Sequence, residues 1–256
     1  MTSAAHSATS QPRRTAGASS SRKVLQLLLS FTERRAESSV AELATIIGTP
    51  VATTYRYVAL LKELQLLEEG RAGRYRVTSQ VMPLARAAQQ ANDLTRLARP
   101  AMEEAARKLR ESIMLFQQFG DTAVCAELVE SDPGVRPVFT AGHSMPLGKG
   151  ASGKMLLAIL PEYERERIVS SIALRLGPGY RDEIQRAALN RYALSADETT
   201  EGVWACSVPV PYSGNRPSAL TVAAPSARLT DEAKRIAVTT LQVTAARVHS
   251  AVSSYS

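Results

Sequence analysis

Two short amphipathic segments joined by a tight turn constrain the first third of this chain more than any other feature. Ser39 and Glu42 stand three residues apart, the spacing of a capping box in which each side chain accepts a hydrogen bond from the other's backbone amide. Apolar residues then recur at helical spacing as far as Gly48, where the helix is predicted to end. A second helix is predicted to start at once, with Thr49 as its N-cap and Pro50 in its first turn.

A further helix is predicted before this pair and a two-stranded hairpin after it. The apolar face of the first helix is formed by Val24, Leu27, Leu28 and Phe31. After the pair, the four residues GRAG separate LLEE from RYRV, and glycine at both ends of this tip indicates a turn between strands. Three helices followed by a hairpin form a winged helix-turn-helix.

Such a fold places the second helix of the pair in the DNA major groove and the wing against the backbone or minor groove. The side chains predicted to meet base edges or phosphates are Val51, Ala52, Thr53, Tyr55, Arg56, Arg71 and Arg74. Each also has an ordinary structural explanation, because surface threonines, core tyrosines and solvated turn arginines are common. The prediction depends on all these elements occurring in order within about 60 residues.

The net charge is concentrated in the same part of the chain. Residues 1–90 hold 12 Lys and Arg against 6 Asp and Glu, whereas residues 91–256 hold 19 against 18. A basic module beside a nearly neutral one favours a polyanion such as duplex DNA as partner, although basic tails also arise for solubility. Residues 1–20 are rich in Ser, Ala and Thr, and this composition predicts a disordered arm that carries Arg13 and Arg14.

Composition argues against several other classes of protein. Cys125 and Cys206 stand far apart, so no disulfide framework or zinc-binding cysteine pattern is available, and a reducing compartment is expected. No apolar run reaches the roughly 18 residues of a membrane span, and the first residues lack the apolar core of a secretory signal. We therefore expect a cytoplasmic protein with no membrane partner. His6, His143 and His249 are scattered, so no catalytic site, metal site or cofactor is predicted.

From Ser21 to Ser250 the sequence resembles the IclR family of bacterial transcription regulators. In the first half the likeness is carried by VAELATIIGTPVATTYRYVALLKELQLLEE, which includes the Thr-x-x-Arg portion at Thr53–Arg56. Many members have Lys-Ser after the proline, where this chain has Val51 and Ala52. The resemblance therefore implies fewer and more apolar contacts to DNA at these two positions.

The second half resembles the effector-binding domain of the family, which implies a GAF-like α/β fold. Its most specific segment is GHSMPLGKGASGKMLLAIL, residues 142–160. This segment is also similar to a P-loop, but Met155 stands where a magnesium-binding Ser or Thr is needed. By the resemblance, Lys154 lies in a helix beside a ligand pocket and binds no nucleotide.

A second segment, EGVWACSVPVPYSGNRPSALTVAAPSARL at residues 201–229, resembles paired strands that line the same pocket. Alternation predicts that Val203, Ala205 and Ser207 face one side, with Trp204, Cys206 and Val208 on the other. The resemblance implies that the effector contacts Met145, Leu147, Ser152, Val203, Ala205, Ser207, Thr221 and Ala223. Core hydroxyls bonded to one another are the alternative explanation for the Ser and Thr of this set.

Two departures concern the polar groups of this pocket. The family often has an acidic residue near the position of Ser195, and its loss here leaves the usual polar anchor in doubt. Lys149, Lys154 and Arg216 could pair with a carboxylate ligand, but we expect each of them to be exposed.

Residues 80–95 are predicted to form a linker helix, with Pro83 at its start and Pro100 in the first turn of the next helix. The resemblance implies that this linker helps dimerisation, and a plain connecting helix is the alternative. The chain is thus expected to be a two-domain α/β protein. Its parts are the arm at 1–20, a winged helix-turn-helix at 21–79, the linker at 80–95 and a GAF-like effector-binding domain at 96–256.

Together these features predict a transcription regulator that binds a double-stranded DNA operator as a homodimer or a dimer of dimers. A small effector, an organic acid or aromatic catabolite, is expected to modulate operator affinity. Two alternatives remain: a second domain that only oligomerises, and an enzyme fused to a DNA-binding module, for which Ser144 beside His143 is a weak candidate. The residues are compatible with repression and with activation.

Overall fold

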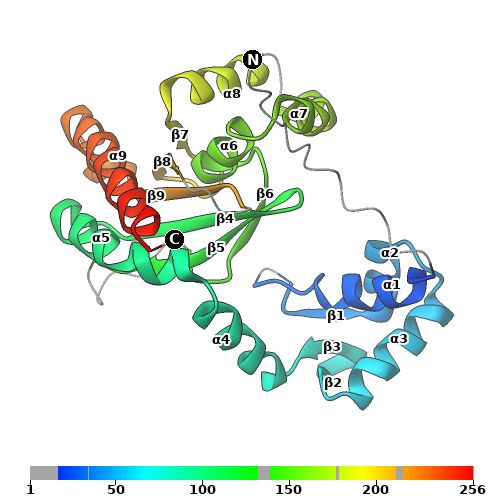
Figure 1. The fold of residues 1–256 in the computed structure, drawn as a ribbon. Coiled ribbons are helices and arrows are strands. Elements are labelled where there is room, and N and C mark those ends of the chain that lie inside the picture. Colours follow the sequence, from blue (N-terminus) through cyan, green and yellow to red (C-terminus); the bar gives the residue numbers. More distant parts are fainter. Residues whose placement is uncertain (1–16, 34, 132–138, 177–178, 212–215, 256) are drawn as a thin grey trace, which may run out of the picture. The chain divides into compact units, whose positions relative to one another are not determined.

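The computed structural model describes residues 17–33, 35–131, 139–176, 179–211 and 216–255 (Figure 1). The chain divides into two compact units, residues 1–84 and residues 85–256, called here the N-terminal and C-terminal units. Most of the predicted arm, with His6, Arg13 and Arg14, lies outside the described residues. The last two residues assigned to the arm, Ser19 and Ser20, already belong to the first helix.

The N-terminal unit is a winged helix-turn-helix, as predicted. Its helices are α1 (Ser19–Leu28), α2 (Val40–Ile47) and α3 (Val51–Glu63), and its strands are β1 (Glu37–Ser39), β2 (Leu67–Glu69) and β3 (Arg74–Val77). A short 3₁₀ turn, Arg71–Gly73, forms the tip of the wing. The strand order is β1-β3-β2 with antiparallel neighbours, so β1 adds a third strand that was not predicted.

A small apolar core holds these elements together. It is built from side chains of all three helices and both wing strands: Leu27, Val40, Leu43, Ile47, Val58, Leu61, Leu67 and Tyr75. The predicted capping box is confirmed, with the Glu42 amide donating to Ser39 Oγ at 3.3 Å and the Ser39 amide donating to Glu42 Oε2 at 2.8 Å. Gly48 ends α2 with φ 60° and ψ 54°, a left-handed conformation that glycine adopts at little cost.

The prediction that Thr49 caps the next helix is wrong. Helix α3 begins at Val51, so Pro50 occupies the N-cap position with φ −55° and ψ 142°, and no side chain caps the helix. The Thr49 hydroxyl instead donates to the Ile47 carbonyl at 3.4 Å, and the Thr54 hydroxyl donates to the Pro50 carbonyl at 3.1 Å. The fixed φ of proline and this internal bond start the helix without a hydroxyl cap.

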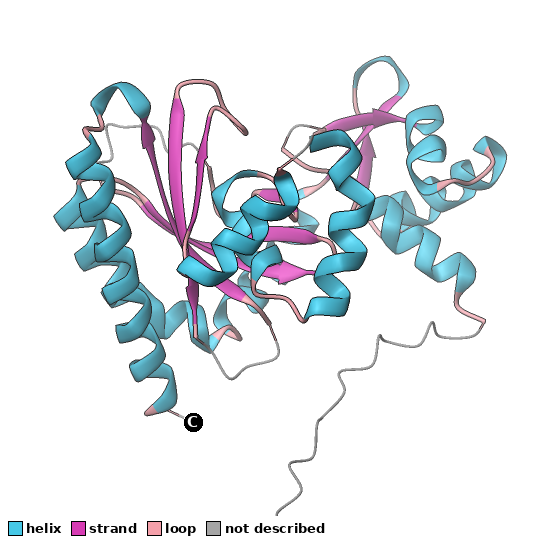
Figure 2. Cartoon of the chain, turned by 90° about the horizontal axis from the view of Figure 1, so that it is seen from above, coloured by secondary structure: helices cyan, strands magenta, loops and turns pink. Residues whose placement is uncertain are grey.

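The C-terminal unit contains an antiparallel sheet of order β6-β5-β4-β9-β8-β7 within the described ranges. Its strands are β4 (Ile113–Phe119), β5 (Thr122–Val129), β6 (Ser144–Pro146), β7 (Ala193–Ala196), β8 (Val203–Val210) and β9 (Ser218–Pro225). Its helices are α5 (Asp93–Leu109), α6 (Gly150–Ala158), α7 (Glu162–Leu176), α8 (Tyr180–Asn190) and α9 (Asp231–Ser253). Helices α5 and α9 cover one face of the sheet, and α6 lies on the other face with α7 and α8 beside it (Figures 1 and 2).

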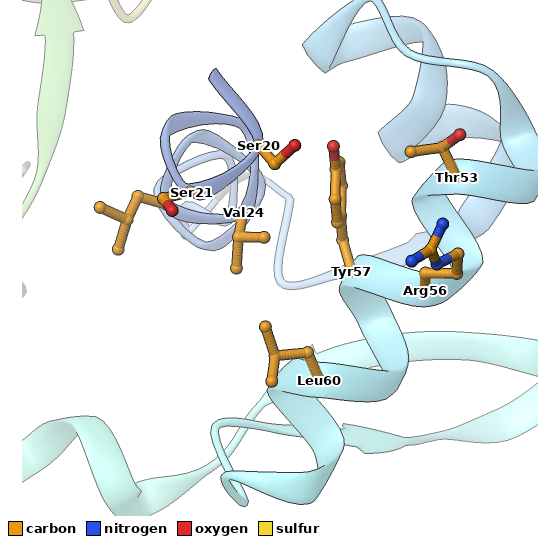
Figure 3. A pocket seen from close by; sticks show the side chains of 8 residues that line it. Ser20, Ser21, Val24, Thr53, Arg56, Tyr57 and Leu60 are labelled. Atoms are coloured by element: carbon orange, nitrogen blue, oxygen red, sulfur yellow. The ribbon is translucent and has the colours of Figure 1, made fainter. Parts of the chain in front are cut away.

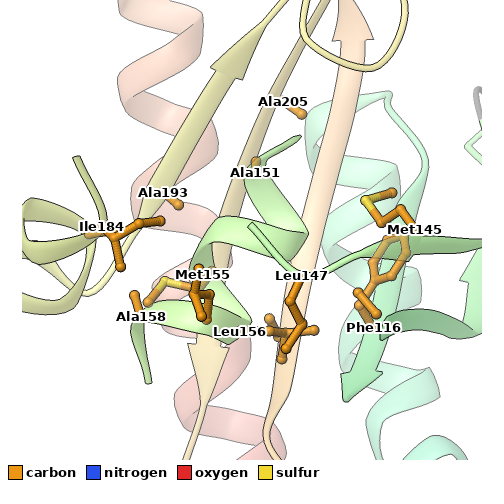
Figure 4. Packing of buried hydrophobic residues seen from close by; sticks show 14 of the residues in the cluster. Phe116, Met145, Leu147, Ala151, Met155, Leu156, Ala158, Ile184, Ala193 and Ala205 are labelled. Carbon is orange, nitrogen blue, oxygen red and sulfur yellow. The ribbon is translucent and has the colours of Figure 1, made fainter. Parts of the chain in front are cut away.

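Strand β8 shows why the sheet has two cores. Val203 and Ala205 pack in the cluster under α6, whereas Trp204, Cys206 and Val208 pack against α5 and α9. The predicted alternation is therefore confirmed, because successive side chains of a strand point to opposite faces. Figure 4 shows the first cluster, with Ala205 of β8 near Ala151 of α6 and with Met155 of the same helix near Ile184 of α8.

The linker region differs in detail from the prediction. Helix α4 covers Met82–Gln90, and the division between the two units falls inside it, at Leu84. The next helix, α5, begins at Asp93 because the Asn92 side chain accepts a hydrogen bond from the Thr95 amide at 3.3 Å. Pro100 thus lies inside α5 and not in its first turn, which corrects the predicted helix start. None of the described helices is long and apolar enough to cross a bilayer.

Helix α6 approaches the preceding loop so closely that Gly153 has no room for a side chain. A Cβ at this position would lie 2.9 Å from the Pro146 carbonyl oxygen and 3.1 Å from the Gly148 nitrogen, and both of these are backbone atoms. We predict that Gly153→Ala lowers the free energy of unfolding by about 1–3 kcal/mol, the usual cost of overpacking, and that Gly153→Ser costs more. Urea unfolding of the full chain measures both, and an unchanged midpoint for Gly153→Ala would contradict this packing.

Candidate nucleic-acid interface and ligand site

The predicted recognition helix presents one face to solvent. Val51 and Tyr55 are 45% and 56% exposed, Ala52 and Arg56 are also exposed, and Thr53 is half-buried. The opposite face is closed, because Thr54 and Val58 are buried in the core of the unit. The five predicted positions of α3 are therefore sterically available to a DNA groove.

Between α1 and α3 lies an open pocket of ≈ 520 Å³ (Figure 3). Its lining comes from both helices: Ser20, Ser21, Val24, Leu25, Thr53, Arg56, Tyr57 and Leu60. Tyr57, which could have been a core residue, stands half-buried at this groove. Two predicted DNA-contacting side chains, Thr53 and Arg56, thus lie at the edge of a groove and not on a flat surface.

The two wing arginines of the prediction have different surroundings. Arg71 lies exposed at the tip, and the described residues form no ion pair with it. Arg74 donates to the Glu42 carboxylate at 2.9 Å and to the Glu37 carbonyl at 3.0 Å. The pKa of Glu42 is lowered, first because it accepts the Ser39 backbone N–H and then because of Arg74. Arg74 is thus engaged within the domain, whereas Arg71 is not.

In the C-terminal unit, side chains from other segments form hydrogen bonds with backbone groups of the loop before α6 and of the first residue of that helix. Gly148 has φ 84°, and its carbonyl accepts a hydrogen bond of 2.6 Å from the Tyr180 hydroxyl of α8. The first amide of α6, that of Gly150, donates to Glu198 Oε2 at 3.2 Å. Burial, followed by the nearby carboxylates Glu183 and Glu198, raises the pKa of Tyr180, so this hydroxyl stays a donor.

Lys154 is the central charged residue of this region, and the prediction that it is exposed is wrong. Its side chain is 1% exposed, and its ammonium group donates to Glu183 on α8 and to Glu198 in the β7–β8 loop, each at 2.5 Å. Burying an ammonium group without partners costs several kcal/mol, so these carboxylates are required. The P-loop-like lysine therefore holds three elements of its own chain together. Lys149 and Arg216 are exposed, as predicted.

The predicted effector-contacting residues share the face of the sheet under α6. The hydroxyl of Thr221 on β9 lies 3.1 Å from the Ser152 hydroxyl on α6 and 2.9 Å from the Ser207 hydroxyl on β8. Ser207 also donates to the Leu220 carbonyl at 3.2 Å. The hydroxyl groups thus satisfy one another, as the structural alternative predicts. The apolar members Met145, Leu147, Ala205 and Ala223 are buried in the adjoining cluster, and Val203 packs at its edge.

A pocket of ≈ 550 Å³ lies at the loop before α6. It is lined by Pro146, Leu147, Gly148, Lys149, Ile172, Tyr180, Glu183 and Glu198. Leu147 alone belongs both to this lining and to the predicted effector set. A ligand that touches Ser152, Thr221 and Ala205 therefore needs room that these side chains now fill.

Glu183 and Glu198 are charged residues of this region that were not predicted from the sequence. One signal pointed to them: Lys154 stands in GASGKMLLAIL, a helix too apolar to expose one face, so its charge needs acidic partners. Ser195, near whose position the resemblance implies an acidic residue, is buried on β7 opposite Ala205. Glu198 follows it three residues later and supplies a carboxylate to the same helix.

The described residues show little support for covalent catalysis. Burial raises the pKa of the Cys206 thiol to about 12, so it is not a thiolate at neutral pH. His143 is buried with its ring 4.5 Å from the Phe139 ring, and His249 is exposed on α9. Within the described ranges, no three His, Cys, Asp or Glu residues are grouped so as to hold a metal ion.

An exposed helix after a tight turn, followed by a hairpin wing, defines a DNA-binding protein of the winged-helix class. Two family models match the chain: the IclR helix-turn-helix domain over residues 20–71 and the bacterial transcriptional regulator IclR C-terminal domain over residues 86–250. The chain belongs to the IclR family of DNA-binding transcriptional regulators, as the sequence predicted.

Individual relatives agree with this assignment. The regulator KdgR of Escherichia coli is 30% identical over 248 residues, which cover 91% of this chain and 92% of that protein. The crystal structure of an IclR family regulator from Brucella abortus has a TM-score of 0.80 at 23% identity, covering 91% of this chain and 92% of that one. An IclR homologue from Microbacterium hydrocarbonoxydans, complexed with 4-hydroxybenzoate, has a TM-score of 0.68 at 22% identity and covers 92% of this chain and all of that one.

The buried lysine yields a rescue test. We predict that the double substitution Glu183→Gln with Glu198→Gln lowers the free energy of unfolding by roughly 3–5 kcal/mol, because it leaves an ammonium group buried without a counter-charge. Adding Lys154→Met removes that charge and should restore most of the loss. Thermal and urea unfolding of the full chain measure these changes. If the triple variant is no more stable than the double one, the carboxylates do not act through Lys154.

Proposed function

We propose that this regulator binds its operator as a dimer or a dimer of dimers and that a small organic ligand in the C-terminal unit changes operator affinity. In this proposal residues 21–79 bind DNA, residues 80–95 link the domains, and residues 96–256 bind the ligand. The observation that carries the DNA-binding part is the exposed face of α3, in the same unit as an exposed wing-tip arginine that has no ion pair among the described residues. A two-fold dimer would place two such helices about one DNA turn apart, roughly 34 Å.

The proposed DNA contacts fall into two groups. Val51, Ala52, Thr53 and Tyr55 offer two apolar groups, a hydroxyl and a phenol to base edges, while Arg56 and Arg71 offer charge to a base or phosphate. Arg74 is the weakest member of the set, because its guanidinium group is already engaged. Base preference is therefore proposed to come from few contacts and affinity mostly from phosphates.

The proposed ligand site lies under α6, at Met145, Leu147, Ser152, Val203, Ala205, Ser207, Thr221 and Ala223. The hydroxyl groups offer hydrogen bonds, and the remaining side chains offer a mostly apolar surface. A homologue of the same fold binds 4-hydroxybenzoate, an aromatic acid, which supports a ligand of this class here. Such a ligand would need to move α6 or its loop, and that movement is how binding could be passed to the DNA-binding unit.

The DNA-binding part of the proposal has a direct test. We predict that Arg56→Ala and Arg71→Ala each weaken binding to duplex DNA and reduce the slope of log affinity against log salt by about 1, since each removes one phosphate contact. Arg186→Ala on α8 removes the same charge from the other unit and is the matched control, because Arg186 is exposed and has no ion pair among the described residues; it is expected to change neither quantity. Fluorescence anisotropy over a salt series measures this. Equal slopes for all three variants would exclude Arg56 and Arg71 from the interface.

The ligand site is tested separately with 4-hydroxybenzoate and a panel of small carboxylic acids as probes. We predict that at least one acid raises the melting temperature and that Thr221→Val weakens its binding by about 10-fold, the worth of one hydrogen bond. Thr244→Val removes a buried hydroxyl from α9, on the other face of the sheet, and should leave binding unchanged. The absence of any thermal shift would favour the alternative in which this unit only oligomerises.

A further inference from the structure

The wing carries three arginines, and two of them are already neutralised by glutamates of the same domain. Arg76 donates to Glu68 at 2.6 Å and lies 3.7 Å from Glu37. Arg74 meets Glu42 through both of its terminal nitrogens, at 2.9 Å and 3.3 Å. Arg71 has no such partner among the described residues. Of the three positive charges of the wing, only that of Arg71 is thus without a carboxylate partner among the described residues.

The contact between Arg74 and Glu42 has the geometry that a guanidinium group uses with phosphate. Two nitrogens face two oxygens of one anion, which is the bidentate arrangement common to carboxylate and phosphate partners. Both side chains remain accessible, with 39% and 49% of their surfaces exposed, so a DNA phosphate can reach the same guanidinium group. Glu42 and a phosphate are therefore competitors for one cation.

Glu42 is well placed for this role because a second interaction holds it. Its carboxylate accepts the Ser39 amide at 2.8 Å as part of the capping box, so the charge is fixed at the start of α2. Hydrogen bonding to Ser39, aided by Arg74, lowers its pKa, which keeps it ionised at neutral pH. A fixed carboxylate competes better than a mobile one, since little side-chain entropy remains to be lost.

We propose that Glu42 acts as an internal substitute for DNA phosphate at Arg74 and thereby limits the affinity of this regulator for DNA of any sequence. This inference rests on the proposed DNA-binding function. Sequence-independent affinity comes almost entirely from phosphate contacts, so withdrawing one cation weakens it. Operator recognition then depends more on the base contacts of α3, which matters because competing non-specific sites vastly outnumber operators.

The substitution Glu42→Gln separates the two roles of this residue. Glutamine also completes a capping box, so the start of α2 is kept while the charge is removed. Glu63→Gln, at the end of α3, is the matched control because Glu63 is exposed and has no ion pair among the described residues. Both variants change the net charge of the same domain by the same amount, but only the first releases an arginine.

Binding of the full chain to a random 30-base-pair duplex, followed by anisotropy at several salt concentrations, tests the inference. We expect Glu42→Gln to bind roughly 3- to 10-fold more tightly at low salt, with a salt slope steeper by up to about 0.9, the contribution of one phosphate contact. Glu63→Gln should show a smaller gain without a change of slope. In the variant Glu42→Gln with Arg74→Gln the gain should vanish.

Two results would overturn the inference: equal behaviour of Glu42→Gln and Glu63→Gln, or a gain that persists after Arg74 is removed. Either result leaves the proposed function intact. Wild-type protein that shows no salt-dependent binding to duplex DNA would contradict the proposed function, and the inference with it. Melting temperatures of all variants show whether the capping box has survived, and a loss for Glu42→Gln well beyond that of Glu63→Gln would also count against the proposed separation of roles.

Discussion

The buried ammonium group of Lys154 is the interaction on which the arrangement of the C-terminal unit depends. It is the charged group of a helix whose side chains are all buried, and it must be neutralised where it stands. Its two carboxylates come from α8 and from the β7–β8 loop, so charge neutralisation joins three segments that are distant in sequence. The same Glu198 also receives the first amide of α6. One charge thus helps to hold α6 on its face of the sheet.

The N-terminal unit uses charge differently. Its ion pairs lie at the surface, where each contributes little to stability because water screens both partners. These ion pairs instead reduce the number of wing arginines that are available to bind a polyanion. The contrast between the two units follows from burial alone: a buried pair organises the fold, while an exposed pair sets how many cations remain available.

Local patterns in the sequence predicted the elements whose causes are local. The capping box at Ser39, the left-handed Gly48 and the alternation along β8 depend on residues within a few positions of one another, and each is present in the structure. The errors at Thr49 and Pro100 are also local: proline at the N-cap made a hydroxyl cap unnecessary, and Asn92 started α5 earlier than the proline suggested. Where two nearby residues could each start a helix, the spacing of apolar residues does not show which of them does so.

Features that depend on distant residues were not predicted. Strand β1 has three residues and exists only because Glu37–Ser39 pairs with Arg74–Arg76 across the domain. The partners of Lys154 lie 29 and 44 positions away, so periodicity carried no sign of either carboxylate. The position and charge of Arg74 predicted a DNA contact. Only the fold shows that the Glu42 carboxylate lies within hydrogen-bonding distance of its guanidinium group. In each case the missing information is a tertiary contact and not a local preference.

The alternate side chains of strand β8 belong to two different apolar clusters. Ala205 and its neighbours on that face adjoin α6, whereas Trp204, Cys206 and Val208 anchor the sheet to α5 and α9. A substitution at Ala205 therefore changes the packing under α6. A substitution at Trp204, Cys206 or Val208 changes the packing of the sheet against α5 and α9. Because Trp204 to Val210 are all buried, neither face of this strand can take a larger side chain without displacing a neighbouring helix.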